Sequence, residues 1–554
     1  MHVDYDVVVV GSGFGGSVAA LRLTEKGYRV GVLEAGRRFA DHELPTTSWQ
    51  LRNFLWAPAL GCYGIQRIHL LRNLVVLAGA GVGGGSLNYA NTLYRPPKAF
   101  FADPQWAQLA DWRAELDPYY DQAERMLGVT AYPGHTAADE VMQRVARDMG
   151  VLKTYQPTRV GVFFGAPGEQ VDDPYFGGAG PRRTGCIECG SCMTGCRVGA
   201  KNTLAKNYLY LAERAGAVVH PLATVTAVRP QRDGSWVVDA VHTAKRRRWS
   251  ITADEVVFAA GTWGTQQLLH RMRDKGILPR LSPRLGELTR TNSEAIVGAS
   301  RATVDPLRDF SGGVAITSSF YPDEHTHIEP VRYGRGSNAM GLLQTVSTDG
   351  ASDTPRWRQL VRFIRRHPLR TVRLLSVRRW SERTVILLVM QTLDNSLTTY
   401  RHRGRLTSRY GHGKPNPTFI PAGFHASQLT AKHIGGTAGS TWGELFEIPM
   451  TAHFLGGCPM GTTAEDGVID AYHRVHGYPG LSVVDGSAVS ANLGVNPALT
   501  ITALAERAFA LWPNKGDPDC RPSPGEDYQH LAPTTPRTPA VSQDARGALR
   551  LTRG

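Results

Sequence analysis

The strongest constraint on the fold is a glycine-rich turn that directly follows an apolar run near the start of the chain. Residues 5–10 form a β-branched run, and Gly11-Ser-Gly13-Phe-Gly15-Gly16 follows without a gap. Helical spacing of apolar side chains continues over residues 17–26, and a second predicted strand, residues 29–35, contains Glu34. The order of strand, glycine turn, helix, strand and acid predicts a dinucleotide-binding βαβ unit.

Each part of this unit has a physical task. Gly11 allows the sharp turn, Gly13 lets the backbone approach a pyrophosphate, and Gly16 lets helix and strand pack closely. The start of the helix presents free N–H groups to phosphates, and Glu34 accepts hydrogen bonds from ribose hydroxyls. An acid at the ribose argues against a 2′-phosphate at this site.

A second glycine-rich loop indicates which dinucleotide binds. It spans Gly79-Ala-Gly-Val-Gly-Gly-Gly-Ser86, about 45 residues after Glu34. Two separate glycine loops suit a large tricyclic cofactor better than NAD, because the backbone must also approach an isoalloxazine ring.

Further motifs along the chain resemble one family. They are Ala259-Ala-Gly261-Thr-Trp-Gly264-Thr265, His453-Phe-Leu-Gly-Gly457, Val484-Asp485-Gly486-Ser487, and Gly494-Val-Asn496-Pro497 followed by a predicted helix over 500–507. With the two glycine loops they resemble the glucose–methanol–choline (GMC) oxidoreductases, which bind FAD, over roughly residues 5–510. Within that family the chain looks most similar to the bacterial cholesterol oxidases, above all to their actinobacterial branch.

The resemblance implies a fold, a domain arrangement and a set of cofactor contacts. The fold is α/β: a Rossmann-type FAD-binding domain with a substrate domain of antiparallel β-sheet and helices. The FAD domain is expected over 1–92, 183–268 and 450–512, the substrate domain over 93–182 and 269–449, and a disordered tail over 513–554. Together the motifs predict contacts to the cofactor from Gly11, Gly13, Phe14, Gly16, Glu34, Gly79, Gly83, Gly84, Ser86, Val225, Asp485, Gly486, Asn496 and Pro497.

The sequence departs from the family pattern at two places. Many members have asparagine where Tyr89 stands, and here Asn88 and Asn91 flank that position. The motif at Ala259 usually ends in proline, where this chain has Gln266.

A catalytic pair follows from the chemistry of alcohol oxidation. A base must take the hydroxyl proton and a polar group must orient the oxygen. Imidazole suits the first task, and the resemblance places His453 and Asn496 side by side, whereas His473 and His476 are expected to be ordinary surface or core histidines. Members that act on sterols also use a carboxylate to move a proton between carbons. Glu329 is the candidate here, and a solvated glutamate is the alternative.

Four cysteines are crowded into eleven residues. Cys186, Cys189, Cys192 and Cys196 have the C-x2-C-x2-C-x3-C spacing of bacterial ferredoxins. The spacing predicts a metal site, with an iron–sulfur cluster, zinc, or buried or redox thiols as the interpretations. An iron–sulfur cluster would carry electrons to a carrier and favour a dehydrogenase over an oxidase.

The net charge of +14 is concentrated in one segment. Residues 356–383 hold ten Arg and one acid, Glu382, and apolar residues recur there at helical spacing until Pro368. A basic amphipathic helix of this kind either lies on an anionic membrane surface or is a solvated helix covering the substrate sheet. Nucleic acid is not expected as a partner, because no reader motif is present.

The sequence also predicts location. No basic and apolar leader precedes residue 5, and no window approaches 18 apolar residues, so we expect a cytoplasmic protein without a signal peptide or transmembrane segment, peripheral at a membrane at most. The longest apolar run, residues 385–390, has the length of a buried strand.

Three functions are consistent with these features. The first is FAD-dependent oxidation of a secondary alcohol, the 3β-hydroxyl of cholesterol or a related steroid, to the 3-ketone, with or without Δ5 to Δ4 isomerisation and with oxygen or a carrier as acceptor. The second is a GMC dehydrogenase for a non-sterol alcohol that uses an iron–sulfur cluster. The third is a non-catalytic, membrane-associated electron-transfer flavoprotein.

Overall fold

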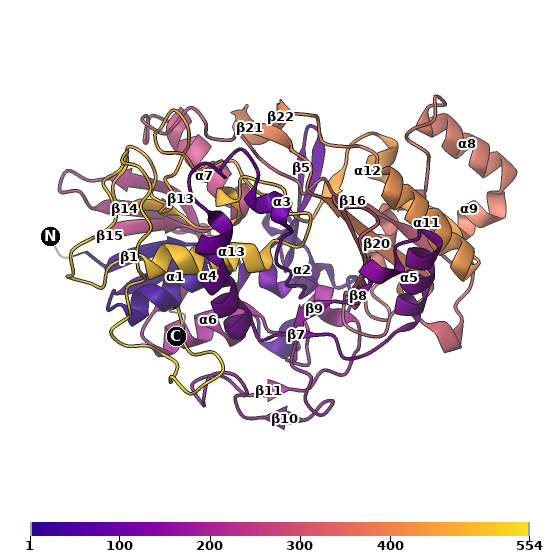
Figure 1. The fold of residues 1–554 in the computed structure, drawn as a ribbon, viewed down its shortest axis with the longest axis horizontal. Helices are drawn as coiled ribbons and strands as arrows, with labels where there is room; N and C mark the ends of the chain where they lie inside the picture. Colours follow the sequence, from indigo (N-terminus) through magenta and orange to yellow (C-terminus); the bar gives the residue numbers. More distant parts are fainter. Residues whose placement is uncertain (1–2, 552–554) are drawn as a thin grey trace.

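The predicted βαβ unit forms the centre of a seven-stranded sheet. In the computed structural model, which describes residues 3–551, β1 lies between β2 and β15 and runs parallel to both. The strands, in the order β12-β2-β1-β15-β14-β13 with β25 also beside β15, are β12 (Val218–His220), β2 (Val30–Leu33), β1 (Tyr5–Val10), β15 (Arg248–Phe258), β14 (Trp236–His242), β13 (Ala223–Pro230) and β25 (Leu481–Val483). This sheet lies at the left of Figure 1.

Helices pack on this sheet and are tied together by buried charges. They are α1 (Phe14–Glu25), α4 (Trp112–Leu127), α6 (Tyr208–Arg214), α7 (Gly261–Asp274) and α13 (Ala498–Ala510). The guanidinium of Arg22 on α1 donates to Glu506 on α13 at 2.7 Å, and Tyr208 on α6 donates to the same carboxylate at 2.6 Å. Because all three side chains are buried, the pairing fixes how the three helices lie against each other.

Main chain packs against main chain where the parallel strands end. A β-carbon at Gly11, after β1, would lie 2.3 Å from the carbonyl oxygen of Ala259, which follows β15. A β-carbon at Gly15 would lie 2.0 Å from the carbonyl oxygen of Val484, which follows β25. Glycine is therefore required at both positions, and the carboxyl ends of β1, β15 and β25 come together at one edge.

A second, antiparallel sheet lies at the right of Figure 1. Its order is β18-β20-β16-β23-β19, with bounds β18 (Thr326–Val331), β20 (Thr384–Gln391), β16 (Ala295–Ser300), β23 (Thr437–Thr441) and β19 (Gln344–Val346). The helices α5 (Ala137–Asp148) and α11 (Pro421–Ile434) share a hydrophobic core with one face of it. The opposite face is turned toward the first sheet. This confirms the predicted fold class, and β20 is the buried strand expected over 385–390.

Smaller elements complete the chain. The three-stranded sheet contains β5 (Gln66–Leu71), β6 (Leu74–Gly79) and β24 (Met450–Thr451). Among the described strands, β21 (Asn395–His402) pairs only with β22 (Arg405–Gly413), outside the sheet that contains β20. Two-stranded pairs are β3 (Trp56–Ala57) with β4 (Cys62–Tyr63), β7 (Val129–Ala131) with β9 (Arg159–Gly161), β8 (Gln156–Pro157) with β17 (Ser318–Ser319), and β10 (Gln170–Val171) with β11 (Arg183–Thr184). The remaining helices are α2 (Leu51–Phe54), α3 (Lys98–Phe101), α8 (Arg356–Arg366), α9 (Pro368–Leu375), α10 (Trp380–Arg383) and α12 (Trp442–Leu445).

The C-terminal tail differs from the expected disorder. Over residues 513–551 it has neither helix nor strand, yet Val541, Ala545 and Ala548 are buried. Its backbone N–H groups donate to α1, from Thr538 to the carbonyl of Glu25 at 3.0 Å and from Ala540 to the Glu25 carboxylate at 2.8 Å. The tail is held in place by hydrogen bonds and apolar contacts to other segments. Such contacts do not require a regular spacing of apolar residues, so the sequence of the tail shows no periodicity.

Between residues 3 and 551, no helix is both long enough and apolar enough to cross a bilayer.

Candidate active site

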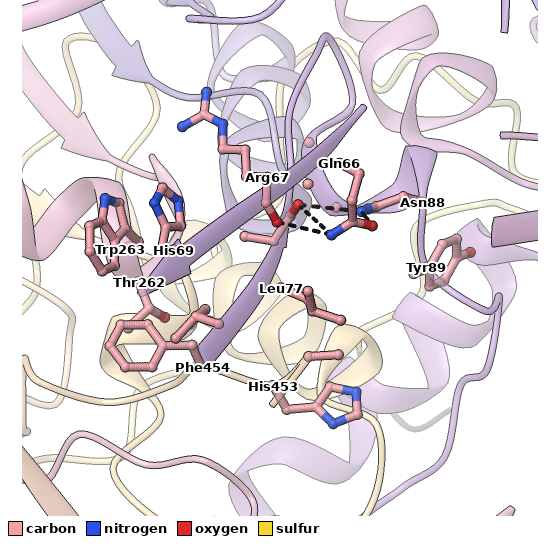
Figure 2. Close-up of a pocket in the computed structure, with 18 of the residues that line it drawn as sticks. Gln66, Arg67, His69, Leu77, Asn88, Tyr89, Thr262, Trp263, His453 and Phe454 are labelled. Atoms are coloured by element: carbon pink, nitrogen blue, oxygen red, sulfur yellow. Dashed lines mark hydrogen bonds between the residues drawn. The ribbon is translucent and has the colours of Figure 1, made fainter. Parts of the chain in front are cut away.

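A cavity of about 600 Å³ lies between the two sheets. One wall comes from the carboxyl ends of the parallel strands and the loops after them, and the other from β16, β18 and β20 of the second sheet. Figure 2 shows part of the lining near β5 and β6, with His453 and Phe454 on one side of Leu77 and the stacked rings of His69 and Trp263 beyond Phe454.

Three helix N-termini meet at this cavity. Gly13 and Phe14 at the start of α1, Gly261 and Thr262 at the start of α7, and Pro497 at the start of α13 all line it. None of these helices has an acidic residue in its first turn. Free N–H groups and the positive ends of three helix dipoles therefore face one space, which favours an anionic ligand.

The structure brings most of the predicted cofactor residues to the cavity. Those that line it are Gly11, Gly13, Phe14, Glu34, Gly79, Gly84, Val225, Asp485, Gly486, Asn496 and Pro497. Gly16, Gly83 and Ser86 are not among the lining residues and serve packing and turn geometry instead. A β-carbon at Gly16 would lie 2.1 Å from the carbonyl oxygen of Gly11, and Ser86 Oγ accepts from the N–H of Leu204 at 3.0 Å.

The lining fits FAD. A β-carbon at Gly13 would meet no protein atom within 4 Å, so this position is open to a ligand, while one at Gly84 would lie 2.6 Å from the α-carbon of Gly13. The two glycine loops thus touch and form one cradle. Thr262 Oγ1 and Asn496 Oδ1 are buried at the cavity without a hydrogen-bond partner among the described residues. Such orphaned polar atoms are expected where a polar ligand binds.

His453 stands beside a carboxylate. It follows β24, and its Nδ1 lies 2.9 Å from Oε2 of Glu294. The distance is that of a hydrogen bond, but the carboxylate lies off the direction of a linear N–H···O bond, and Nδ1 has no other hydrogen-bond partner in residues 3–551. The side chain of Glu294 is fully buried and also lines the cavity.

Asn496 and Glu329 are the second polar pair. Glu329 on β18 is opposite Leu388 of β20, and Leu388 lines the cavity, so both side chains project from the same face of the sheet. The pKa of Glu329 is raised to about 8, chiefly by burial and also by the charge of Glu294, while a hydrogen bond from the amide of Asn496 opposes the shift. Burial lowers the pKa of the neighbouring His327, 3.9 Å away, to about 3, so that ring brings no positive charge. The alternative of a solvated Glu329 is wrong.

Sequence reasoning missed Glu294 because of its setting. It ends a six-residue polar run, 289–294, that looks like a surface loop, yet every residue of the run is buried. The only signal in the sequence for a buried Glu294 is that this polar run directly precedes an apolar strand.

The departures from the family pattern have structural roles. Tyr89 and Asn88 line the cavity, and Asn88 donates to Gln66 at 2.8 Å (Figure 2), whereas the side chain of Asn91 is buried without a described partner. Gln266 donates to the carbonyl of Gly456 at 2.7 Å and so supports the loop that follows His453.

His473 and His476 lie in the core, where backbone carbonyls face their rings. The carbonyl of Val483 is 2.8 Å from Nδ1 of His473, and the carbonyl of Gly461 is 3.0 Å from Nε2 of His476.

The cysteine segment does not support the predicted iron–sulfur or zinc site. Within residues 3–551, no three His, Cys, Asp or Glu side chains are placed to hold a metal ion. Cys192 and Cys196 are buried in an apolar cluster, and Cys189 is exposed. Burial raises the pKa of Cys186 and of Cys192 to about 12. Turns at Gly190 and Gly195 fold the segment, and buried thiols are the interpretation that fits.

Comparisons with known proteins agree with this geometry. Residues 6–381 match the family described as FAD dependent oxidoreductase, and residues 424–505 match GMC oxidoreductase. The cholesterol oxidase of Mycobacterium tuberculosis is 63% identical over 99% of this chain and 98% of its own length, and that of Acinetobacter baumannii is 42% identical over 93% and 95%. The crystal structure of pyridoxine 4-oxidase from Mesorbium loti has a TM-score of 0.58 at 16% identity, covering 91% of this chain and 98% of that one, and supports the fold alone.

The fold and the cavity thus define an FAD-dependent oxidoreductase. The chain belongs to the GMC oxidoreductases.

Replacement of Gly13 by alanine tests the cradle. The methyl group meets no protein atom and φ is −72°, so we expect the apoprotein to keep its melting temperature. The same methyl group would occupy space that a pyrophosphate approaches, so FAD affinity should fall at least about tenfold. Flavin titration and absorbance of the purified protein measure this. Gly312→Ala, at an exposed position that is also free of neighbours, is the matched control. Native affinity in Gly13→Ala would contradict the assignment.

Proposed function

We propose that the protein oxidises the 3β-hydroxyl of cholesterol or a closely related steroid to the 3-ketone. The observation that carries this proposal is the similarity to two cholesterol oxidases along nearly the whole chain, combined with a cavity in which His453 and Asn496 both face the space between the cofactor cradle and the second sheet. FAD, when bound, supplies the acceptor for the hydride that leaves the alcohol carbon.

The chain's own residues handle the hydroxyl group. His453 takes the hydroxyl proton, and Asn496 orients the oxygen that loses it by donating from its amide nitrogen. Both residues are more than nine-tenths buried, so the reacting groups are kept from bulk water.

The second sheet offers a surface suited to a sterol. Its cavity face carries aliphatic side chains at alternate positions, namely Ile296, Val331, Ile386 and Leu388. A rigid apolar ring system placed against this face removes apolar surface from water on both sides, which favours binding. Beyond the sheet the cavity extends to Trp380 on α10.

His453→Gln is the first test, with cholesterol, related 3β-hydroxysteroids and simple alcohols as substrates. We expect the native protein to turn over 3β-hydroxysteroids and the variant to lose about 10²- to 10⁴-fold in kcat with FAD retained, because proton transfer to a positioned base is lost. Oxygen consumption compared with dye reduction identifies the acceptor.

The outcomes separate the rival functions. Turnover of simple alcohols but of no 3β-hydroxysteroid would favour a non-sterol GMC dehydrogenase. A flavoprotein that oxidises no alcohol and is indifferent to His453→Gln would favour non-catalytic electron transfer.

Glu329 is our candidate for the base of an isomerisation step. It would take a proton from one carbon of the 3-ketone and return it to another, moving the double bond into conjugation. Two observations support it: its side chain is buried, and it projects from the cavity face beside the amide of Asn496.

The isomerisation should depend on pH. The carboxyl of Glu329 is protonated below its pKa of about 8 and can act as a base only above it, so the conjugated fraction of the product should rise as the pH passes through about 8. Product analysis of early time points from about pH 6 to pH 10 measures this. Glu329→Gln should still oxidise the alcohol but release the unconjugated ketone. A product ratio that is flat across this range, or isomerisation at the native rate in Glu329→Gln, would contradict the role.

A membrane contact through α8 and α9 is a second proposal. The two helices project from the body at the upper right of Figure 1, and no residue of α8 is buried. Trp357 is 56% exposed, Leu369 71% and Val372 68%, and arginines surround them. A solvated helix would not expose so many apolar side chains, whereas anionic phospholipid matches both the apolar residues and the charge. Trp380, which lines the cavity, belongs to α10, the helix that follows α9, so the exposed helices are joined to the cavity wall.

Charge reversal tests this contact. Arg362→Glu, Arg365→Glu and Arg366→Glu together should abolish binding to vesicles that contain anionic phospholipid, and leave turnover of detergent-solubilised sterol unchanged. Vesicle co-sedimentation measures the binding. The same reversal at Arg246 and Arg247, exposed between β14 and β15, and at Arg248, exposed at the start of β15, keeps the change in net charge and is the matched control. Equal vesicle binding by the two triple variants would overturn the proposal.

A further inference from the structure

We infer that Glu294 is a positioning residue for His453: its carboxylate holds the proton of the imidazole on Nδ1 and so leaves Nε2 free to take the hydroxyl proton. This inference rests on the proposed function, since it concerns the base of that reaction. Glu294 belongs to no motif of the sequence, and its role follows from its contacts.

The contacts converge on one oxygen. Oε2 of Glu294 accepts from the hydroxyl of Thr451 at 2.9 Å and from the N–H of Ala452 at 3.1 Å, and Nδ1 of His453 lies 2.9 Å away. Because a carboxylate can only accept, the nitrogen that faces it is favoured as the protonated one. The inference requires the ring to turn until this N–H points at Oε2. The remaining nitrogen, Nε2, then carries the lone pair that a general base needs.

The backbone of the same segments fixes the geometry. The N–H of His453 donates to Thr451 Oγ1 at 2.9 Å, so the hydroxyl that contacts Glu294 also orients the peptide of His453. Directly before Glu294, Asn292 and Ser293 have φ values of 60° and 45°, a left-handed conformation that is costly for residues other than glycine. A strained turn of this kind persists only where surrounding contacts hold it.

Those surrounding contacts reach Asn496. The N–H of Asn292 donates to Asn492 Oδ1 at 2.9 Å, its Nδ2 donates to the carbonyl of Val495 at 2.9 Å, and its Oδ1 accepts from the N–H of Gly494 at 2.7 Å. The turn that presents Glu294 to His453 therefore also holds the loop that ends at Asn496. Both polar groups of the site depend on one buried segment.

Two variants separate the position of the acceptor from its charge. In Glu294→Gln an oxygen can still accept from Thr451 and Ala452, so the fold and the tautomer should be kept. The negative charge that stabilises the protonated ring is lost, and kcat should fall about tenfold with KM and FAD content unchanged. In Glu294→Ala the acceptor is gone, and kcat should fall further.

Rescue of kcat by formate tests directly whether a carboxylate at the position of Glu294 is what His453 needs. Glu294 lines the cavity, so a small carboxylate can reach the space left in Glu294→Ala, and we expect formate to restore part of kcat in this variant. His453→Gln lacks the base itself and is the control in which formate should restore nothing.

The tautomer of His453 gives a readout that does not depend on turnover. Nitrogen NMR of protein labelled with ¹⁵N-histidine, with His453 assigned by its loss in His453→Gln, should show Nδ1–H in the native protein and in Glu294→Gln, and loss of that preference in Glu294→Ala. An unchanged tautomer in Glu294→Ala, or native kcat in Glu294→Gln, would overturn the inference. If Glu294→Ala does not fold, Glu294→Gln decides alone. A native protein that oxidises no alcohol would instead refute the proposed function.

Discussion

The close approach of main chain at the ends of β1, β15 and β25 is the constraint on which the rest of the structure depends. Gly11 and Gly15 leave no room for a β-carbon because carbonyl oxygens of Ala259 and Val484 occupy that space. The turns after three parallel strands are thereby packed on each other, and α1 and α7 begin at the same edge of the sheet. Their N-termini, joined by that of α13, make the electropositive wall that an anionic dinucleotide requires.

The polar groups of the site stand where this wall meets the second sheet. Glu294 immediately precedes β16, Glu329 lies within β18, His453 follows β24, and Asn496 precedes α13 by two residues. Each is attached to the end or the middle of a regular element and is buried. Their relative positions are therefore set by sheet register and helix packing, which hold a geometry more closely than a free loop does.

Local patterns explain what could be predicted from the sequence. The strand over residues 5–10, the glycine turn and the end of α8 before Pro368 depend on neighbouring residues, and the structure places each as expected. Glu294 could not be found in this way, because the burial of its polar run is a property of the tertiary fold. The cysteine spacing is also a local pattern, but it did not predict the structure of this segment correctly. Cys192 and Cys196 pack in an apolar cluster, which depends on the tertiary fold. Likewise the tail is ordered by partners in α1, far away in sequence.

Two buried carboxylates a short way apart behave differently because their surroundings differ. Glu294 is met by a hydroxyl, a backbone N–H and an imidazole, whereas the amide of Asn496 is the polar group that opposes the desolvation of Glu329. Desolvation is therefore only partly compensated at Glu329, and the charge of Glu294 adds to the rise of its pKa. The carboxylate with three partners is suited to orient a base, and the one with a single amide beside it is suited to exchange a proton near neutral pH. The repulsion between them links the two roles, because any group that neutralises Glu294 also makes Glu329 easier to ionise.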